Sequence, residues 1–207
     1  MTIKATSMLS ILAIWVGTIV GVAISPGAWP SIIFAALATG AVGVSAWRRI
    51  GISRLAAMAG TWGAVGWAMA AHEGNWWISI FAFLTTGAVV YSTMRRDALL
   101  AGAGVAVAWL ACAAASHPHE GAAWMAIFAF LTAGAISNTG GNVRGLSAIL
   151  WWTIAAGIVI AGGTGWAWVG VIAFVLTSAS LGFSDFNFPR GLEWDLFDRD
   201  DDSGTIR

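Results

Sequence analysis

Long apolar runs and short polar breaks alternate along most of the chain. Each apolar run is long enough, as a helix, to cross about 30 Å of hydrocarbon. The pattern predicts eight membrane-spanning helices, at residues 7–24, 31–47, 54–71, 76–94, 98–115, 122–137, 146–161 and 166–182. The predicted fold class is therefore all-α, a polytopic membrane helix bundle.

An internal repeat of about 47 residues underlies this alternation. Residues 72–89 return as residues 119–136 with twelve of eighteen positions identical, and residues 25–42 form a fainter copy. A looser fourth copy, residues 171–180, follows at an offset of 45. Each period holds two runs, so successive units share one orientation. We expect four tandem helical hairpins, each contacting its sequence neighbours in a closed or arc-shaped array. Their approximate bounds are 7–47, 54–94, 98–137 and 146–182.

The composition is that of a membrane protein. Hydrophobic residues make up 58% of the chain and charged residues 10%, against about 45–50% and about 25% in ordinary soluble domains. Residues 1–182 form one predicted membrane domain. Apart from Arg54, the first residue of one span, no predicted span contains Asp, Glu, Lys, Arg or His, which argues against a proton-coupled carrier or an ion pump. No nucleophile motif and no metalloprotease motif is present, so we expect no enzyme.

The basic residues predict the orientation of the chain. Three loops between predicted spans carry Arg48, Arg49, Arg54, Arg95, Arg96 and Arg144, whereas the alternate turns carry no Lys or Arg. The positive-inside rule places the arginine loops and both termini in the cytoplasm, and the other turns outside the cell membrane. The first span has a basic start at Lys4, like a signal peptide. However, Trp15 lies 47 residues before Trp62, which places that span in the repeat.

The last 25 residues differ from the rest. Residues 183–207 are acidic and contain several aromatic side chains. A solvated cytoplasmic end is one interpretation, and a docking segment for a cytoplasmic protein partner is the other. The net negative charge disfavours nucleic acid and anionic lipid as ligands of this tail. For the remaining chain the predicted partner is the lipid bilayer.

Two turns on the side opposite the arginines carry the clustered metal-ligand types. These candidate ligands are His72, Glu73, His117, His119 and Glu120. Imidazoles and carboxylates bind zinc, copper or non-haem iron, and imidazole also ligates haem or a pigment. If a metal site exists, His72, His119 and Glu120 are its three expected ligands. The alternative is a polar turn, because Pro26 and Thr164 fill the slot of Glu73 and Glu120 in the other repeats.

Three tryptophans at the 47-residue spacing form a second candidate. Trp15, Trp62 and Trp109 fall near the middle of predicted spans. An indole N–H in hydrocarbon needs a partner, so these rings are expected to face protein. They either line a cavity for an apolar or cationic ligand or pack the repeats together.

The first turn resembles a known kind of membrane protein. Ser25, Pro26 and Trp29 follow a helix that contains Trp15. This arrangement resembles the SPW-repeat proteins of bacteria and archaea, which consist of two-helix units whose turn carries Ser-Pro-Trp. The later turns depart from that motif, with His72-Glu73 and His119-Glu120 in its place. The resemblance implies hairpin architecture and no activity, substrate or catalytic residue.

Three function classes follow from these patterns. The first is a non-enzymatic membrane protein with a structural, assembly or stress-related role, or one that binds a small apolar molecule. The second is a subunit that binds metal, haem or pigment at the His-Glu-Gly turns. The third is a facilitator for a small neutral solute.

Overall fold

Eight α-helices, joined in pairs by short 3-10 turns, make up the described chain. The structure is a computed structural model and describes residues 3–44, 50–94, 98–139 and 141–180. The helices are α1 (Ile3–Ile24), α2 (Ser31–Val44), α3 (Ile52–Ala71), α4 (Ile78–Val90), α5 (Leu99–Ser116), α6 (Met125–Thr139), α7 (Asn142–Gly162) and α8 (Val169–Ala179). The turns contain η1 (Pro26–Ala28), η3 (Glu73–Trp77), η4 (Glu120–Ala122) and η5 (Thr164–Trp166).

The all-helical class predicted from the hydrophobic pattern is confirmed. Each of the eight predicted runs contains one helix, and the described residues hold no strand. The largest differences are four residues: α1 and α7 begin four residues earlier than predicted, and α4 ends four residues earlier. The helices α4, α6 and α8 begin two or three residues later than predicted. There the chain first forms a 3-10 turn, which includes Trp76, Ala122 and Trp166. Their hydrophobicity makes these residues look like part of the helix, but it does not show whether their backbone forms 3-10 or α-helical hydrogen bonds.

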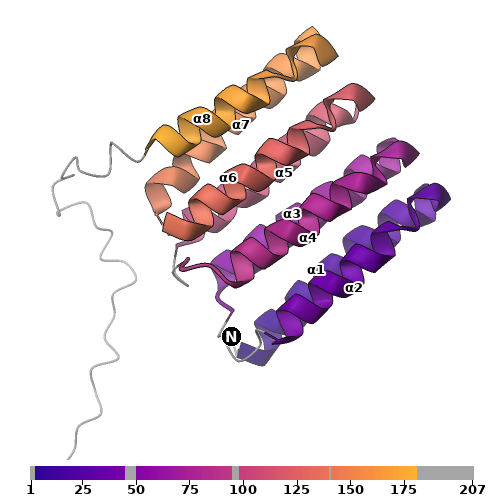
Figure 1. Cartoon of the computed structure of the whole chain (residues 1–207), viewed down its shortest axis with the longest axis vertical. Helices are drawn as coiled ribbons and strands as arrows, with labels where there is room; N and C mark the ends of the chain where they lie inside the picture. Colours follow the sequence, from indigo (N-terminus) through magenta and orange to yellow (C-terminus); the bar gives the residue numbers. More distant parts are fainter. Residues whose placement is uncertain (1–2, 45–49, 95–97, 140, 181–207) are drawn as a thin grey trace, which may run out of the picture.

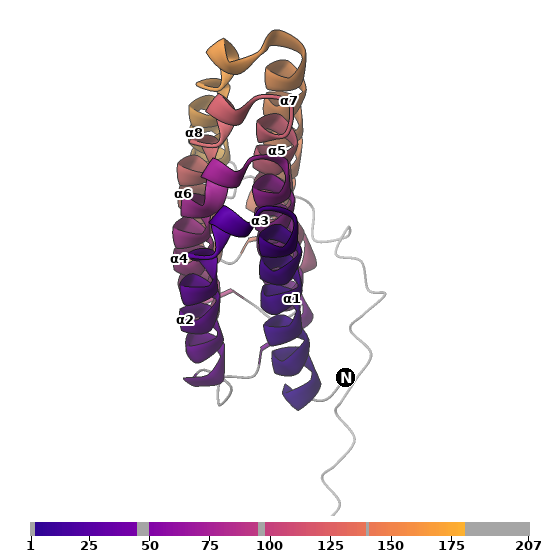
Figure 2. The same ribbon diagram turned by 90° about the vertical axis from the view of Figure 1, so that its right-hand side faces the viewer.

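The helices pair as four hairpins that stand side by side in a row (Figure 1). Along the row, α1, α3, α5 and α7 form one layer, and α2, α4, α6 and α8 form the other (Figure 2). We call these the odd layer and the even layer. The α1–α2 hairpin and the α7–α8 hairpin lie at opposite ends of the row (Figure 1). Of the two expected forms, a closed or an arc-shaped array, the closed one is wrong, because the two ends of the row do not meet (Figure 1).

The two layers pack by different means. In the odd layer, glycines allow close contact between backbones: a Cβ on Gly104 would lie 2.6 Å from the carbonyl oxygen of Gly145. In the even layer, aromatic rings bridge neighbouring helices. The centroid of Phe81 lies 6.0 Å from that of Phe130, and the centroid of Phe128 lies 6.2 Å from that of Phe174. Small residues thus set the distance between neighbouring helices in the odd layer, and aromatic rings set it in the even layer.

Four helical segments of the described chain are long and apolar enough to cross a membrane. They are Ala5–Ile24, Leu99–Ser116, Glu120–Asn138 and Asn142–Gly162. Two further apolar segments, Ser31–Val44 and Thr164–Ala179, are shorter. The arginines at positions 48, 49, 95 and 96 and the acidic tail at 183–207 lie outside the described residues.

Candidate functional site

The four turns pack against one another at one end of the row, which we call the turn end. Each turn after the first places one side chain over the glycine of the turn before it. Glu73 lies against Gly27, and Glu120 lies 2.9 Å from where a Cβ of Gly74 would be. The methyl group of Thr164 lies 3.1 Å from the corresponding point on Gly121. Glu73 and Glu120 therefore act as spacers between hairpins, and glycine leaves room for them.

The histidines of the turn end also link neighbouring hairpins. Nε2 of His72 lies 2.9 Å from the carbonyl oxygen of His117, which follows the last residue of α5. Nε2 of His119 lies 3.4 Å from the carbonyl oxygen of Ile160, near the end of α7. A carbonyl only accepts hydrogen bonds, so Nε2 of each ring carries the proton. Each imidazole thus satisfies one of the free carbonyls that every helix leaves at its C-terminal end.

These contacts leave little support for a metal centre. Among the residues that the structure describes, no group of three or more His, Cys, Asp or Glu side chains is arranged to hold a metal ion. His72, Glu73, His117, His119 and Glu120 all belong to that part of the chain. The protonated Nε2 atoms of His72 and His119 face main-chain oxygens instead. The ring of His117 packs at 5.9 Å on the indole of Trp67.

The repeated tryptophans lie at different degrees of burial. Trp62 is 0% exposed and Trp109 is 1% exposed, as expected for rings that face protein, while Trp15 is half-buried. The indole N–H of Trp62 donates to the hydroxyl of Thr86 across the layers at 3.0 Å. Trp15 borders a shallow concavity on α1 with Met8, Leu9, Ile11 and Leu12. The three rings do not gather around one cavity in the described chain, which favours the packing interpretation.

Trp109 differs from Trp62 in its hydrogen bonding. Its indole nitrogen is buried and has no hydrogen-bond partner among the described residues. Ala133 stands 47 residues after Thr86, so the hydroxyl that Trp62 uses is missing in the next hairpin. The hydroxyl of the adjacent Thr132 accepts instead from Trp152 of α7, at 3.1 Å. A buried donor without a partner costs about 1–3 kcal/mol.

Two arginines are buried at the end of the bundle opposite the turns. Arg54, in the first turn of α3, donates from Nη2 to the carbonyl oxygens of Ser92 and Met94, at 2.9 and 3.0 Å. Arg144, in the first turn of α7, donates to the carbonyl oxygen of Ala135 at 3.0 Å. Carbonyls near the end of a helix carry partial negative charge and favour a cation. These guanidinium groups therefore hold helix ends together.

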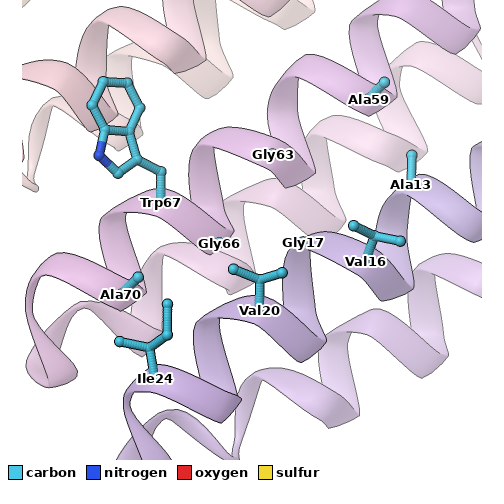
Figure 3. Close-up of a pocket in the computed structure, with 10 residues that line it drawn as sticks. All are labelled: Ala13, Val16, Gly17, Val20, Ile24, Ala59, Gly63, Gly66, Trp67 and Ala70. Carbon is cyan, nitrogen blue, oxygen red and sulfur yellow. The ribbon is translucent and has the colours of Figure 1, made fainter.

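A groove with walls from two helices lies between α1 and α3, on the exposed side of the odd layer (Figure 3). Its volume is about 470 Å³. The lining residues are Ala13, Val16, Gly17, Val20, Ile24, Ala59, Gly63, Gly66, Trp67 and Ala70. Apart from the indole nitrogen of Trp67, none of their side chains carries a polar atom. The groove can therefore hold an apolar molecule, and its lining has no nucleophile, acid or base.

Sequence reasoning missed this groove, although a signal was available. Gly63 and Leu110 occupy equivalent positions, 47 residues apart, and only Leu110 has a side chain at that position. The buried arginines were also missed, because the charge pattern reports sidedness and not the hydrogen bonds of a guanidinium.

Comparisons with known proteins identify no relative of this chain. A scan against protein-family models, a search of curated proteins and a search of solved structures each give no match to the chain.

Proposed function

We propose that the chain is a non-enzymatic integral membrane protein whose eight helices all cross the bilayer as four tandem hairpins, with a structural or assembly role. The observation that carries the proposal is the exposed apolar surface. Large apolar side chains are exposed on all eight helices, among them Leu12, Ile33, Ile52, Leu84, Leu110, Leu131, Ile154 and Ile172. Such a surface is unfavourable in water and suits contact with lipid.

The shorter helices gain length from the 3-10 turns that precede them. Continued through η3 and η5, the fourth and eighth spans run over residues 73–90 and 164–179, or 18 and 16 residues. A span slightly shorter than the hydrocarbon core is accommodated by local thinning of the bilayer, at modest cost. Eight spans are therefore physically reasonable.

The contacts between hairpins support the tandem repeat. Each turn after the first places a side chain over the glycine of the previous turn, at Gly27, Gly74 and Gly121. The same sequence spacing therefore produces the same kind of contact three times. We also propose, from Ser25, Pro26 and Trp29, that these units are related to the two-helix units of SPW-repeat proteins.

The charges support a cell-membrane location with the turn end outside. Arg54 and Arg144 lie at the end opposite the turns, and the turns carry Glu73 and Glu120 but no Lys or Arg. The positive-inside rule then places both termini in the cytoplasm.

A structural role is the function this arrangement supports best. The described residues offer no metal-binding cluster, and the polar side chains of the turn end contact neighbouring turns. No observation favours the metal, haem or pigment subunit, or the solute facilitator. The rigid row of hairpins has the properties of a membrane scaffold.

The test is the sidedness of single cysteines in a Cys112→Ala background. Gly165 is exposed in the last turn with no atom near its Cβ direction, and Asn142 is exposed at the start of α7. We expect a membrane-impermeant maleimide to label Gly165→Cys in intact cells, and to label Asn142→Cys only after permeabilisation.

Pro118→Cys, exposed in the third turn, is the matched control, because the proposal requires it to behave like Gly165→Cys. Labelling of positions 118 and 142 from the same face would refute the crossing of the membrane by α6, and labelling of positions 142 and 165 from the same face would refute the crossing by α7. Recovery of the protein in the soluble fraction would refute membrane insertion altogether.

A further inference from the structure

The groove between α1 and α3 extends along the two helices from the turn end to their middle. Ile24 is the last residue of α1 and Ala70 lies next to the end of α3, whereas Ala13 and Ala59 mark the other limit. From Ala13 to Ile24, at 1.5 Å per residue, the groove is about 16 Å long. Half of a hydrocarbon core about 30 Å thick is about 15 Å. The groove thus has the depth of one leaflet.

Local sequence explains why the groove is open here. A Cβ on Gly63 would meet no atom within 4 Å, so the space beside it is empty. In α5 the equivalent position holds Leu110. Trp67 is turned away from α1 (Figure 3), and its indole packs on the ring of His117 of α5. The result is a gap with a glycine floor, bordered by Val16 and Val20 on the α1 side.

The size of the groove selects its occupant. A volume of 470 Å³ over about 16 Å of length gives a mean cross-section of roughly 29 Å². A second helix, about 10–12 Å across, has a cross-section of roughly 80–110 Å² and does not fit. A hydrocarbon chain one carbon wide, with carbon contacts at about 4 Å, occupies roughly 20 Å². One extended acyl chain therefore fits along the whole groove, whereas a helix of another protein could enter it only with its side chains.

We propose that this groove binds one acyl chain of a lipid from the leaflet at the turn end. The inference rests on the proposed membrane-spanning function. The apolar lining requires an occupant without polar groups over its length, so the lipid headgroup lies beyond Ile24 and Ala70 at the level of the turns. The chain methyl end lies near Ala13 and Ala59. Binding removes the walls of the groove from contact with disordered lipid and completes the α1–α3 packing.

The experiment uses phosphatidylcholine with a photoreactive diazirine near the methyl end of one acyl chain. The full-length protein is reconstituted in vesicles of unlabelled phosphatidylcholine that contain this probe, and is illuminated. Cross-linked peptides are then identified by mass spectrometry. We expect peptides around Ala13 and Ala59 to carry several-fold more probe than peptides of α7 around Gly157, whose Cβ direction is also open.

The decisive variant fills the groove. Gly63→Leu copies the residue that α5 carries at the equivalent position, so the fold has a precedent for it. We expect it to lower probe incorporation at α1 and α3 at least threefold. Gly63→Ala should give an intermediate loss. The matched control, Gly157→Leu, adds the same side chain to an open site on α7 and should leave α1 and α3 labelling unchanged.

Sidedness separates the two proposals. If the Gly165→Cys and Asn142→Cys labels keep opposite sides but Gly63→Leu leaves the labelling unchanged, the groove proposal is overturned and the membrane topology stands. Cross-links to a second protein at Ala13 or Ala59 would also overturn it. Loss of opposite sidedness in the native chain would overturn both.

Discussion

Single hydroxyl groups distinguish one hairpin from the next at the residue scale. Trp62 donates to Thr86, and that hydroxyl itself donates to the carbonyl oxygen of Ala82 at 2.9 Å. Trp109 is as deeply buried as Trp62 but faces no such oxygen in the described chain. In an apolar interior an unpaired N–H keeps the full cost of its desolvation. The second hairpin is therefore fully satisfied at this point and the third is not.

Adding one hydroxyl should correct this difference. Ala133→Ser places an oxygen at the position that Thr86 holds in the preceding hairpin, where it can accept from Trp109. We expect stabilisation of about 1 kcal/mol, the net value of a typical hydrogen bond. The measurement is thermal unfolding in detergent, followed by circular dichroism. A melting temperature that stays the same or falls, with unchanged helix content, would contradict the proposed register.

The matched control removes a hydroxyl from the satisfied hairpin. Thr86→Val keeps the shape of the side chain and leaves the Trp62 N–H buried without its acceptor. Its expected cost is about 1–3 kcal/mol. If positions 86 and 133 are equivalent in the two hairpins, Ala133→Ser should raise the stability of the protein and Thr86→Val should lower it.

At the scale of elements, glycine determines how closely the odd helices approach. The carbonyl oxygen of Leu100 in α5 occupies the space that a Cβ on Gly145 of α7 would need. Gly157, on the same helix, faces open space. Inside a membrane the hydrophobic effect contributes little to helix association. Close packing of this kind therefore supplies much of the free energy that holds the helices together. The two glycines of α7 should therefore respond differently to substitution.

Gly145→Val should separate α5 from α7, because the space beside Gly145 is filled by the backbone of Leu100 and Ala101, which cannot rotate away. We expect destabilisation of about 1–3 kcal/mol or more, the usual cost of overpacking. Gly157→Val adds the same side chain and should change stability by less than about 1 kcal/mol. Both are measured as melting temperatures in detergent. Equal shifts for the two variants would show that α5 and α7 do not pack through Gly145.

The elements themselves were largely predictable, and the turns were not. Hydrophobic runs located every helix, because an apolar segment of this length has few alternatives in a membrane. The 3-10 turn over Glu73–Trp77 escaped prediction because Trp76 and Trp77 are as apolar as the helix that follows. Glu73 and Glu120 were predicted only as parts of a polar turn. Their contacts with Gly27 and Gly74 were missed, because these contacts join residues about 47 positions apart.

For the whole molecule, the repeat predicted neighbour contacts but not the curvature of the row. Curvature depends on small differences in spacing between layers, and these come from Gly104 against Gly145 on one side and Phe81 against Phe130 on the other. The expected ligands His72, His119 and Glu120 do not form a metal-binding group in the described chain, for a related reason. His72 and His119 are equivalent by sequence, and each bonds to the next hairpin along the row, at His117 and Ile160.

The ends of the row carry large side chains where its interior carries small ones. Met8, Leu12 and Ile19 of α1 are exposed. Their places hold Gly102 and Ala106 in α5, 94 residues later, and Gly66 in α3, 47 residues later, whereas Leu55 takes the place of Met8 in α3. Each of these three small residues packs closely on the preceding odd helix. At the other end, Ile154 of α7 is exposed where α3 has Gly60. A bulky outer face keeps another helix from approaching as closely as glycine and alanine allow.

We therefore expect the protein to be a monomer and not a head-to-tail filament, because Met8, Leu12 and Ile19 prevent a second copy from approaching α1 as closely as α3 approaches α5. Native mass spectrometry of the protein in nanodiscs should give one chain per disc across a range of protein-to-disc ratios.

The variant Met8→Gly, Leu12→Ala, Ile19→Gly gives α1 the small residues of the interior and should raise the fraction of dimer, since close backbone approach favours helix association in lipid. Met8→Leu, which keeps the bulk, is the control and should stay monomeric. A ladder of dimers, trimers and longer species from the native chain would show that its ends associate and that these residues do not act as caps.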